Sequence, residues 1–125
     1  MTALNMAQKA YSQAANPTRT DRGAEYEIFA QITRQLVSTA ATRKEAFPAF
    51  VAALHENTRL WTTIAADVAD PGNRLAASLR AQLFYLFEFT TQHTLNILAN
   101  KAEVDVLIEI NTSMMRGLRG RGDDA

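Results

Sequence analysis

The chain has 125 residues, a length that suits a single domain. Thirteen Lys and Arg residues balance thirteen Asp and Glu residues. This neutrality argues against a general nucleic-acid binder, which needs clustered cations to neutralise phosphates. The absence of cysteine excludes disulfides, thiolate metal sites and cysteine nucleophiles. No apolar run of signal-peptide or membrane-span length occurs, so we expect a cytoplasmic protein with no membrane segment.

Helix-forming residues dominate the composition. Only three prolines and five glycines interrupt the chain, and alternating β-branched residues are scarce. We therefore predict an all-α fold, a single compact bundle of four to five helices within one domain over residues 1–119. A flexible C-terminal tail is expected over 120–125. The first helix is expected over 3–15, and the Asn-Pro-Thr sequence at 16–18 ends it.

The next two helices meet at an ambiguous junction. Asp21 can cap a second helix that runs to about Ala41. Thr42 and Glu45 form a capping-box pattern, but Pro48 would then lie inside the helix and remove a backbone donor. The third helix therefore begins either at the capping box or nearer Pro48, and it continues to the next turn.

Two turns delimit the remaining helices. The Asp-Pro-Gly sequence at 70–72 ends the third helix, and Asn73 can cap a fourth that extends to about Ala99. The chain turns at Asn-Lys, residues 100–101, and a fifth helix is expected over 103–118. Apolar residues recur every three or four positions along these helices, as packing in a bundle requires.

The fourth predicted helix is apolar on nearly every side. Its apolar residues form two rows with two further aromatics between them: Leu79, Leu83, Leu86 and Ile97; Phe84, Phe87, Leu95 and Leu98; and Tyr85 and Phe89. Such a helix is either central, with neighbours all round, or at an edge with one row reserved for a partner. We expect the central position, with packing against the second, third and fifth helices.

No group of residues predicts catalysis. His55-Glu56 is similar to the start of a zinc-protease motif, but Arg59 stands where the second histidine ligand is required. Glycine-rich phosphate loops and a serine nucleophile elbow are also missing from the sequence. We expect no catalytic residue, no metal and no cofactor.

Four polar residues interrupt the apolar rows: Glu25, Asn57, His93 and Asn111. Extending the spacing of each row directs all four inward, where polar groups need hydrogen-bonding partners. We predict a buried polar layer, joined by Arg22 or Arg80, that fixes the register of the helices. A helical enzyme that uses Glu25 and His93 is the less favoured alternative.

Four strings of residues follow one another along nearly the whole chain: Arg22-x-x-Glu25-Tyr26-x-x-Phe29, Ala53-Leu54-x-x-Asn57-x-x-Leu60-Trp61, Leu79-Arg80-Ala81 and Leu107-Ile108-x-Ile110-Asn111-x-x-x-Met115-x-Gly117-Leu118. The early Ala10-Tyr11-Ser12, the turn at 67–73 and His93 fit the same pattern. Together they resemble the flagellar biosynthesis regulator family FlaF. The chain departs from the family pattern at 71–76, where no proline follows the leucine.

The resemblance implies a small cytoplasmic protein with no catalytic role, needed for making and exporting flagellin and acting with the partner FlbT. Two mechanisms fit: a chaperone that binds unassembled flagellin, or a post-transcriptional regulator acting on flagellin mRNA. A neutral chain with an apolar fourth helix favours the chaperone, because RNA recognition calls for a basic stripe with exposed stacking residues. A helical adaptor without a flagellin client is a third alternative.

A docking surface follows from the two apolar rows of the fourth helix, because a single helix cannot turn both rows toward one core. We expect a flagellin helix to dock on the second row, with the border residues included: Phe84, Tyr85, Phe87, Phe89 and Leu95. If Phe87 belongs to the core, the groove is expected around Trp61 and Tyr26 instead.

Overall fold

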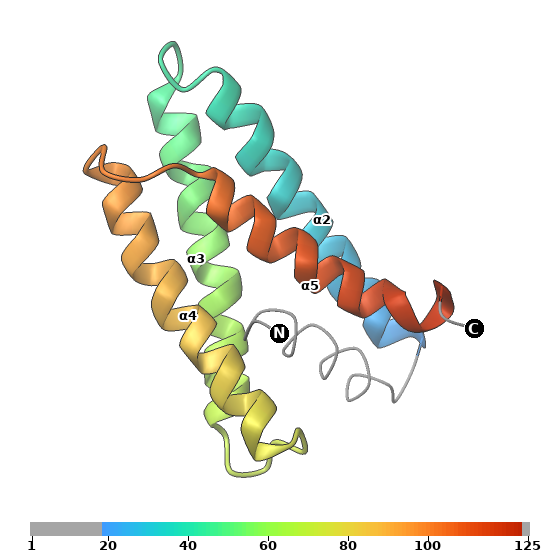
Figure 1. Ribbon diagram of the computed structural model, residues 1–125. Coiled ribbons are helices and arrows are strands. Elements are labelled where there is room, and N and C mark those ends of the chain that lie inside the picture. The colour runs from blue at the N-terminus through green and yellow to red at the C-terminus, as the bar shows by residue number, and fades with distance from the viewer. Residues whose placement is uncertain (1–18, 124–125) are drawn as a thin grey trace.

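The computed structural model describes residues 19–123, and the side chains of residues 23–119 within that range. The described residues form four helices: α2 (Arg19–Ala41), α3 (Phe47–Ala69), α4 (Ala77–Leu98) and α5 (Asp105–Asp123) (Figure 1). No strand occurs in this part of the chain, and the predicted all-α bundle is confirmed. The helix predicted over 3–15 lies outside the described residues.

The junction between α2 and α3 is a turn. The carbonyl of Thr42 accepts the backbone N–H groups of Glu45, at 3.1 Å, and Ala46, at 2.9 Å. The capping-box start is therefore wrong, and α3 begins at Phe47. Pro48 then falls in the first turn, where its missing N–H breaks no helical hydrogen bond.

Asn73 does not cap α4, which corrects the sequence prediction. Its Oδ1 accepts the N–H of Leu75 at 3.0 Å, and its Nδ2 donates to the carbonyl of Asp67 at 3.0 Å. Helix α4 begins only at Ala77, without a side-chain cap. The asparagine side chain instead closes a local turn and ties the loop to the end of α3, a use that competes with helix capping.

Helix α5 is shifted relative to the prediction. It begins at Asp105, whose carboxylate in the first turn suits the positive end of the helix dipole, and it continues to Asp123. The helical backbone thus extends past the predicted end at 118 and into the region expected to be a tail. The division into a domain over 1–119 and a flexible tail stays a prediction.

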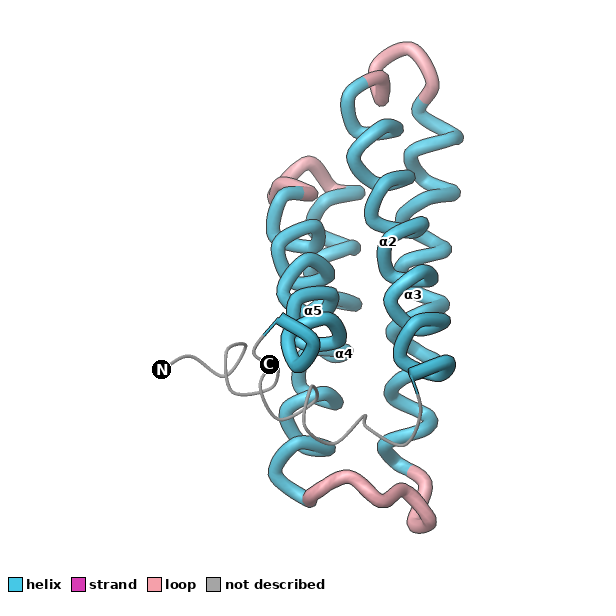
Figure 2. Tube along the Cα trace, turned by 90° about the vertical axis from the view of Figure 1, so that its right-hand side faces the viewer, coloured by secondary structure: helices cyan, strands magenta, loops and turns pink. Residues whose placement is uncertain are grey.

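The helices are arranged in two layers. Figure 2 shows α2 and α3 on one side of the bundle and α4 and α5 on the other, all running roughly along the long axis. Backbones approach closely between α2 and α3, between α3 and α4, and between α2 and α5. Helix α4 therefore lies at an edge of the bundle, against α3, and not in the expected central position. In a two-layer bundle of four helices, each helix keeps one side toward solvent.

Two apolar clusters make up the core. The larger joins all four helices and contains Phe29, Trp61, Val68, Leu79, Leu83, Leu86, Ile110, Met114 and Leu118. The smaller contains Leu36, Phe50, Ala53, Leu54, Ile97, Val104 and Leu107. Although α4 is close to α3 alone along its backbone, its inward side chains thus share the core with residues of α2 and α5.

A pair of buried amides lies between these clusters. Asn57 and Asn111 are fully inaccessible, and the Nδ2 of Asn111 donates to the Oδ1 of Asn57 at 2.7 Å. The Nε1 of Trp61 donates to the Oδ1 of Asn111 at 3.0 Å, so Asn111 joins two side chains of α3 to α5. The Nδ2 of Asn57 is buried and has no hydrogen-bond partner.

This asymmetry predicts unequal costs for removing the two amides. Asn111→Ala breaks two hydrogen bonds and leaves polar atoms of Trp61 and Asn57 buried without partners, at about 1–3 kcal/mol for each orphaned group. Asn57→Ala orphans one atom of Asn111 and also removes the Nδ2 that is already unpaired. Asn111→Ala should therefore lower the free energy of unfolding more than Asn57→Ala does, as measured by urea unfolding followed by circular dichroism. Equal costs would contradict the proposed asymmetry.

Candidate partner-binding surface

Helix α4 buries one side and exposes the other. Its buried residues follow helical spacing along the inner side: Leu79, Leu83, Leu86, Thr90, Thr94 and Ile97. The hydroxyls of the two buried threonines donate to carbonyls of their own helix, from Thr90 to Phe87 at 2.9 Å and from Thr94 to Thr90 at 2.7 Å. The inner side is thus free of unpaired threonine hydroxyls and packs as an apolar surface.

The outer side of α4 carries large apolar side chains in solvent, which we call the α4 outer face. Its members, with the exposed fraction of each, are Phe84 (37%), Tyr85 (56%), Phe89 (37%), Leu95 (56%) and Leu98 (42%). Glu88 is the one charged residue among the exposed residues of this helix. Large apolar side chains grouped in this way on the exposed side of a helix are typical of a protein docking site.

Two ring contacts stiffen the outer face. Phe84 meets Phe87 edge to face, with ring centroids 5.5 Å apart, and Phe89 stacks on the imidazole of His93 with centroids 5.4 Å apart. The imidazole of His93 is in turn anchored to the loop before α5, because its Nε2 lies 2.8 Å from the carbonyl oxygen of Glu103. Phe89 is therefore held by a side chain that is itself anchored.

The end of α4 is fixed by its backbone. Asn100 adopts a positive φ of 60°, and its N–H donates to the carbonyl of Ile97 at 3.0 Å. The N–H of Lys101 reaches back to the carbonyl of Asn96 at 2.8 Å. This pair of bonds is the Schellman arrangement, in which asparagine is one of the few residues that tolerate a left-handed conformation. The helix therefore stops directly after Leu98, the last residue of the α4 outer face.

The structure divides the polar residues predicted to form one layer. Asn57 and Asn111 meet in the core, whereas His93 is half-buried and bonded to the loop before α5. Glu25 is half-buried and lines a groove beside α2. Arg80 has a buried Nε without a partner, and the side chain of Arg22 lies outside those described. The hydrogen-bonded layer that exists also contains Trp61, which is not one of the four residues predicted for it.

Of the five residues predicted to bind a partner, Phe87 differs from the other four. It is half-buried and packs against the larger core cluster, while Phe84, Tyr85, Phe89 and Leu95 are exposed. The fallback groove around Trp61 and Tyr26 is wrong as stated, because Trp61 is completely buried. Asn57 and Trp61 are four residues apart and therefore lie on the same face of α3. This spacing is the sequence signal that could have placed Trp61 in the buried polar layer.

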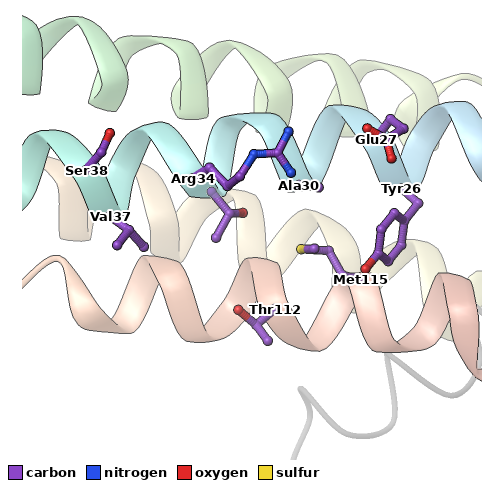
Figure 3. A pocket seen from close by; sticks show the side chains of 9 residues that line it. Tyr26, Glu27, Ala30, Arg34, Val37, Ser38, Thr112 and Met115 are labelled. Atoms are coloured by element: carbon purple, nitrogen blue, oxygen red, sulfur yellow. The ribbon is translucent and has the colours of Figure 1, made fainter.

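Two grooves flank α2, and of the two residues named for the fallback groove only Tyr26 lines one of them, the larger. The larger, of about 510 Å³, lies between α2 and α5, where Tyr26 and Met115 point into the space between the helices (Figure 3). Thr33, whose buried hydroxyl has no hydrogen-bond partner, also lines it. The smaller, of about 290 Å³, lies among α2, α3 and the beginning of α4. Both depend on the packing of several helices, which the apolar spacing within a single helix does not reveal.

The described residues contain no cluster of three or more His, Asp or Glu side chains that could hold a metal ion. None of the described helices is long and apolar enough to cross a bilayer. The surface features of this part of the chain are therefore the exposed apolar residues of α4 and the two grooves beside α2.

The family of the chain is shown by a sequence model. The model of the flagellar protein FlaF matches residues 7–118, so the chain belongs to the FlaF family of flagellar proteins. The match covers all of α2, α3 and α4 and continues into α5 as far as Leu118, so it includes the α4 outer face and both buried amides. Comparison with curated proteins and with solved structures gives no match.

Phe87 and Tyr85 offer a test of the boundary between core and surface. Phe87→Ser should lower the free energy of unfolding by about 1–3 kcal/mol, because it removes a ring packed on the larger core cluster. Tyr85→Ser, two residues away in the same helix but largely in solvent, should change it by less than about 0.5 kcal/mol. Urea unfolding followed by the fluorescence of the single tryptophan measures both. Equal destabilisation would place Tyr85 in the core.

Proposed function

We propose that this flagellar protein binds unassembled flagellin and promotes its synthesis and secretion as a non-enzymatic cytoplasmic export chaperone acting with FlbT. Family membership supports a flagellar role. The observation that carries the proposal is the α4 outer face, whose large apolar side chains are between 37% and 56% exposed. An amphipathic helix of flagellin would bury these side chains, as helices bound to apolar grooves do.

The chemistry of the outer face favours a protein over RNA. Glu88 is its one exposed charge, so the face offers no cation to a phosphate backbone. Its aromatics are mixed with Leu95 and Leu98, which suit the apolar side of a helix better than they suit a base. An effect on translation of flagellin mRNA is then indirect, through the flagellin-bound complex. Direct action on mRNA and an adaptor role without flagellin remain the competing hypotheses.

The docking role predicts which substitutions weaken flagellin binding. Tyr85→Ser and Leu95→Ser each remove a side chain that is more than half exposed, so the fold is retained while contact area is lost. If these residues are central to the interface, each substitution should weaken the complex by about tenfold or more. Isothermal titration of purified flagellin measures the affinity, and size-exclusion chromatography of the co-expressed pair shows whether a stoichiometric complex forms.

Val37→Ser is the matched control. Val37 is an apolar helix residue with a similar exposed fraction, 50%, but it lies on α2 beside the larger groove. It should leave flagellin binding unchanged. Loss of binding in Val37→Ser alone would move the site to the groove between α2 and α5. Absence of any complex from purified components, together with binding of flagellin mRNA, would favour the regulatory hypothesis.

A further inference from the structure

The groove among α2, α3 and α4 is an incomplete part of the core. Its floor consists of the buried side chains Phe29, Val68 and Leu83, all members of the larger core cluster. Half-buried Leu60 and Ile64 form its walls. On its rim Ile28, a large β-branched residue, is 47% exposed. An apolar side chain entering this space would therefore contact the core directly and remove more apolar surface from water.

The polar residues of the groove give it a charge. Two carboxylates line it, from Glu25 and Asp67, and none of its lining residues is basic. The groove between α2 and α5 differs, because Glu27 and Arg34 both line it and their charges cancel. The smaller groove is thus apolar with an acidic edge, and its occupant should be apolar on one side and carry no acidic residue.

The segment before α2 has this composition. Residues 1–18 contain one charged side chain, Lys9, and no Asp or Glu. Drawn as the helix predicted over 3–15, the segment has two sides. The apolar side contains Ala3, Leu4, Met6, Ala7, Ala10, Tyr11 and Ala14, and the polar side contains Asn5, Gln8, Lys9, Ser12 and Gln13.

The length of the helix predicted over 3–15 favours the smaller groove over the larger one. A helix of this length is marginal in water on its own and needs a surface for its apolar side. If residues 3–15 form that helix, a connection of only three residues, 16–18, favours an antiparallel arrangement beside α2. At a rise of 1.5 Å per residue the helix spans about 20 Å, which covers α2 from Arg19 to about residue 31. The α2 residues of the smaller groove end at Phe29, whereas those of the larger groove continue to Ser38.

We propose that residues 3–15 form an amphipathic helix that docks, within the same chain, into the groove among α2, α3 and α4. This inference does not depend on flagellin binding, because the groove is built on the inner side of α4 at Leu83 and not on the α4 outer face. The docked segment completes the larger core cluster, and the α4 outer face stays available to a partner.

The test uses the full chain, whose lack of cysteine permits a single labelled site. Ser12→Cys, on the polar side of the segment, carries a nitroxide spin label, and methyl signals are followed by NMR. We expect paramagnetic broadening at the groove residues Ile28, Leu60 and Ile64. Leu4→Asn combined with Tyr11→Asn removes the apolar contacts and should lower the ratio of docked to undocked chains at least about tenfold, with loss of the broadening. Asn5→Ser, on the polar side, is the matched control and should retain it.

Each other pattern of broadening would overturn the proposal. Signals broadened chiefly at Val37 and Met115 would place the segment in the larger groove, and signals broadened at Leu95 would place it over the α4 outer face. Unaffected signals would show that the segment does not dock. A mixed sample distinguishes docking within one chain from docking between two chains. In it, one set of chains carries only the isotope and the other set carries only the nitroxide. Broadening in this sample would show that the occupant is the segment of a second copy.

Discussion

The side-chain amide of Asn111 is the contact on which the helix register depends. Its Oδ1 accepts a hydrogen bond from Trp61 and its Nδ2 donates one to Asn57, at the level between the smaller and the larger core cluster. A slip of α5 by one turn would bring the amide against apolar side chains and leave three polar groups unpaired. A buried polar group without a partner costs more free energy than its hydrogen bond contributes when it is formed. The network therefore acts mainly by destabilising other helix registers. The direction of α4 follows, because Leu83 and Leu86 pack on the cluster that contains Trp61.

Sequence patterning revealed the helices and the amides because both signals are local. Apolar residues three and four apart predicted all four described helices, and the positions of Asn57 and Asn111 within those rows placed both in the interior. The same spacing misled for Glu25 and His93. Both are half-buried at the margin of the bundle, where a polar side chain can point inward along its helix and still reach solvent. Spacing gives a direction around one helix and not the depth of that helix in the bundle.

The position of α4 shows what a single sequence leaves open. A helix that is apolar all round fits a centre or an edge equally well, and the choice depends on how many neighbours the other helices provide. Here α4 packs closely along its backbone against α3, at the edge of the bundle, so the outer aromatics stay in solvent. The start of α4 was misplaced for a different reason, since Asn73 can satisfy either a helix end or a local turn and both use the same side-chain oxygen. The grooves arise only between elements and leave no trace in the spacing of one helix.

Helix α4 combines a side that stabilises the core with a side that exposes large apolar residues to water. Stability comes from an ordinary core with a satisfied threonine row on the inner side of α4, while the outer side of that helix exposes rings and leucines. Side chains of this kind add nothing to folding when they stay in water. Their grouping on one face, bounded by a fixed helix end after Leu98, is more readily explained by binding than by packing.

The outer face also has a colloidal consequence, because the chain carries no net charge. Two copies approaching in solution experience no long-range repulsion that would offset the attraction between exposed aromatic surfaces. Added salt has no net repulsion between copies to screen, and salts that strengthen apolar association favour contact between the exposed faces. Under the proposed docking of flagellin, the protein is kept dispersed chiefly by how often its apolar face is covered. Its solubility would then depend on the ratio between this protein and flagellin, and overproduction of the chain alone would disturb that ratio.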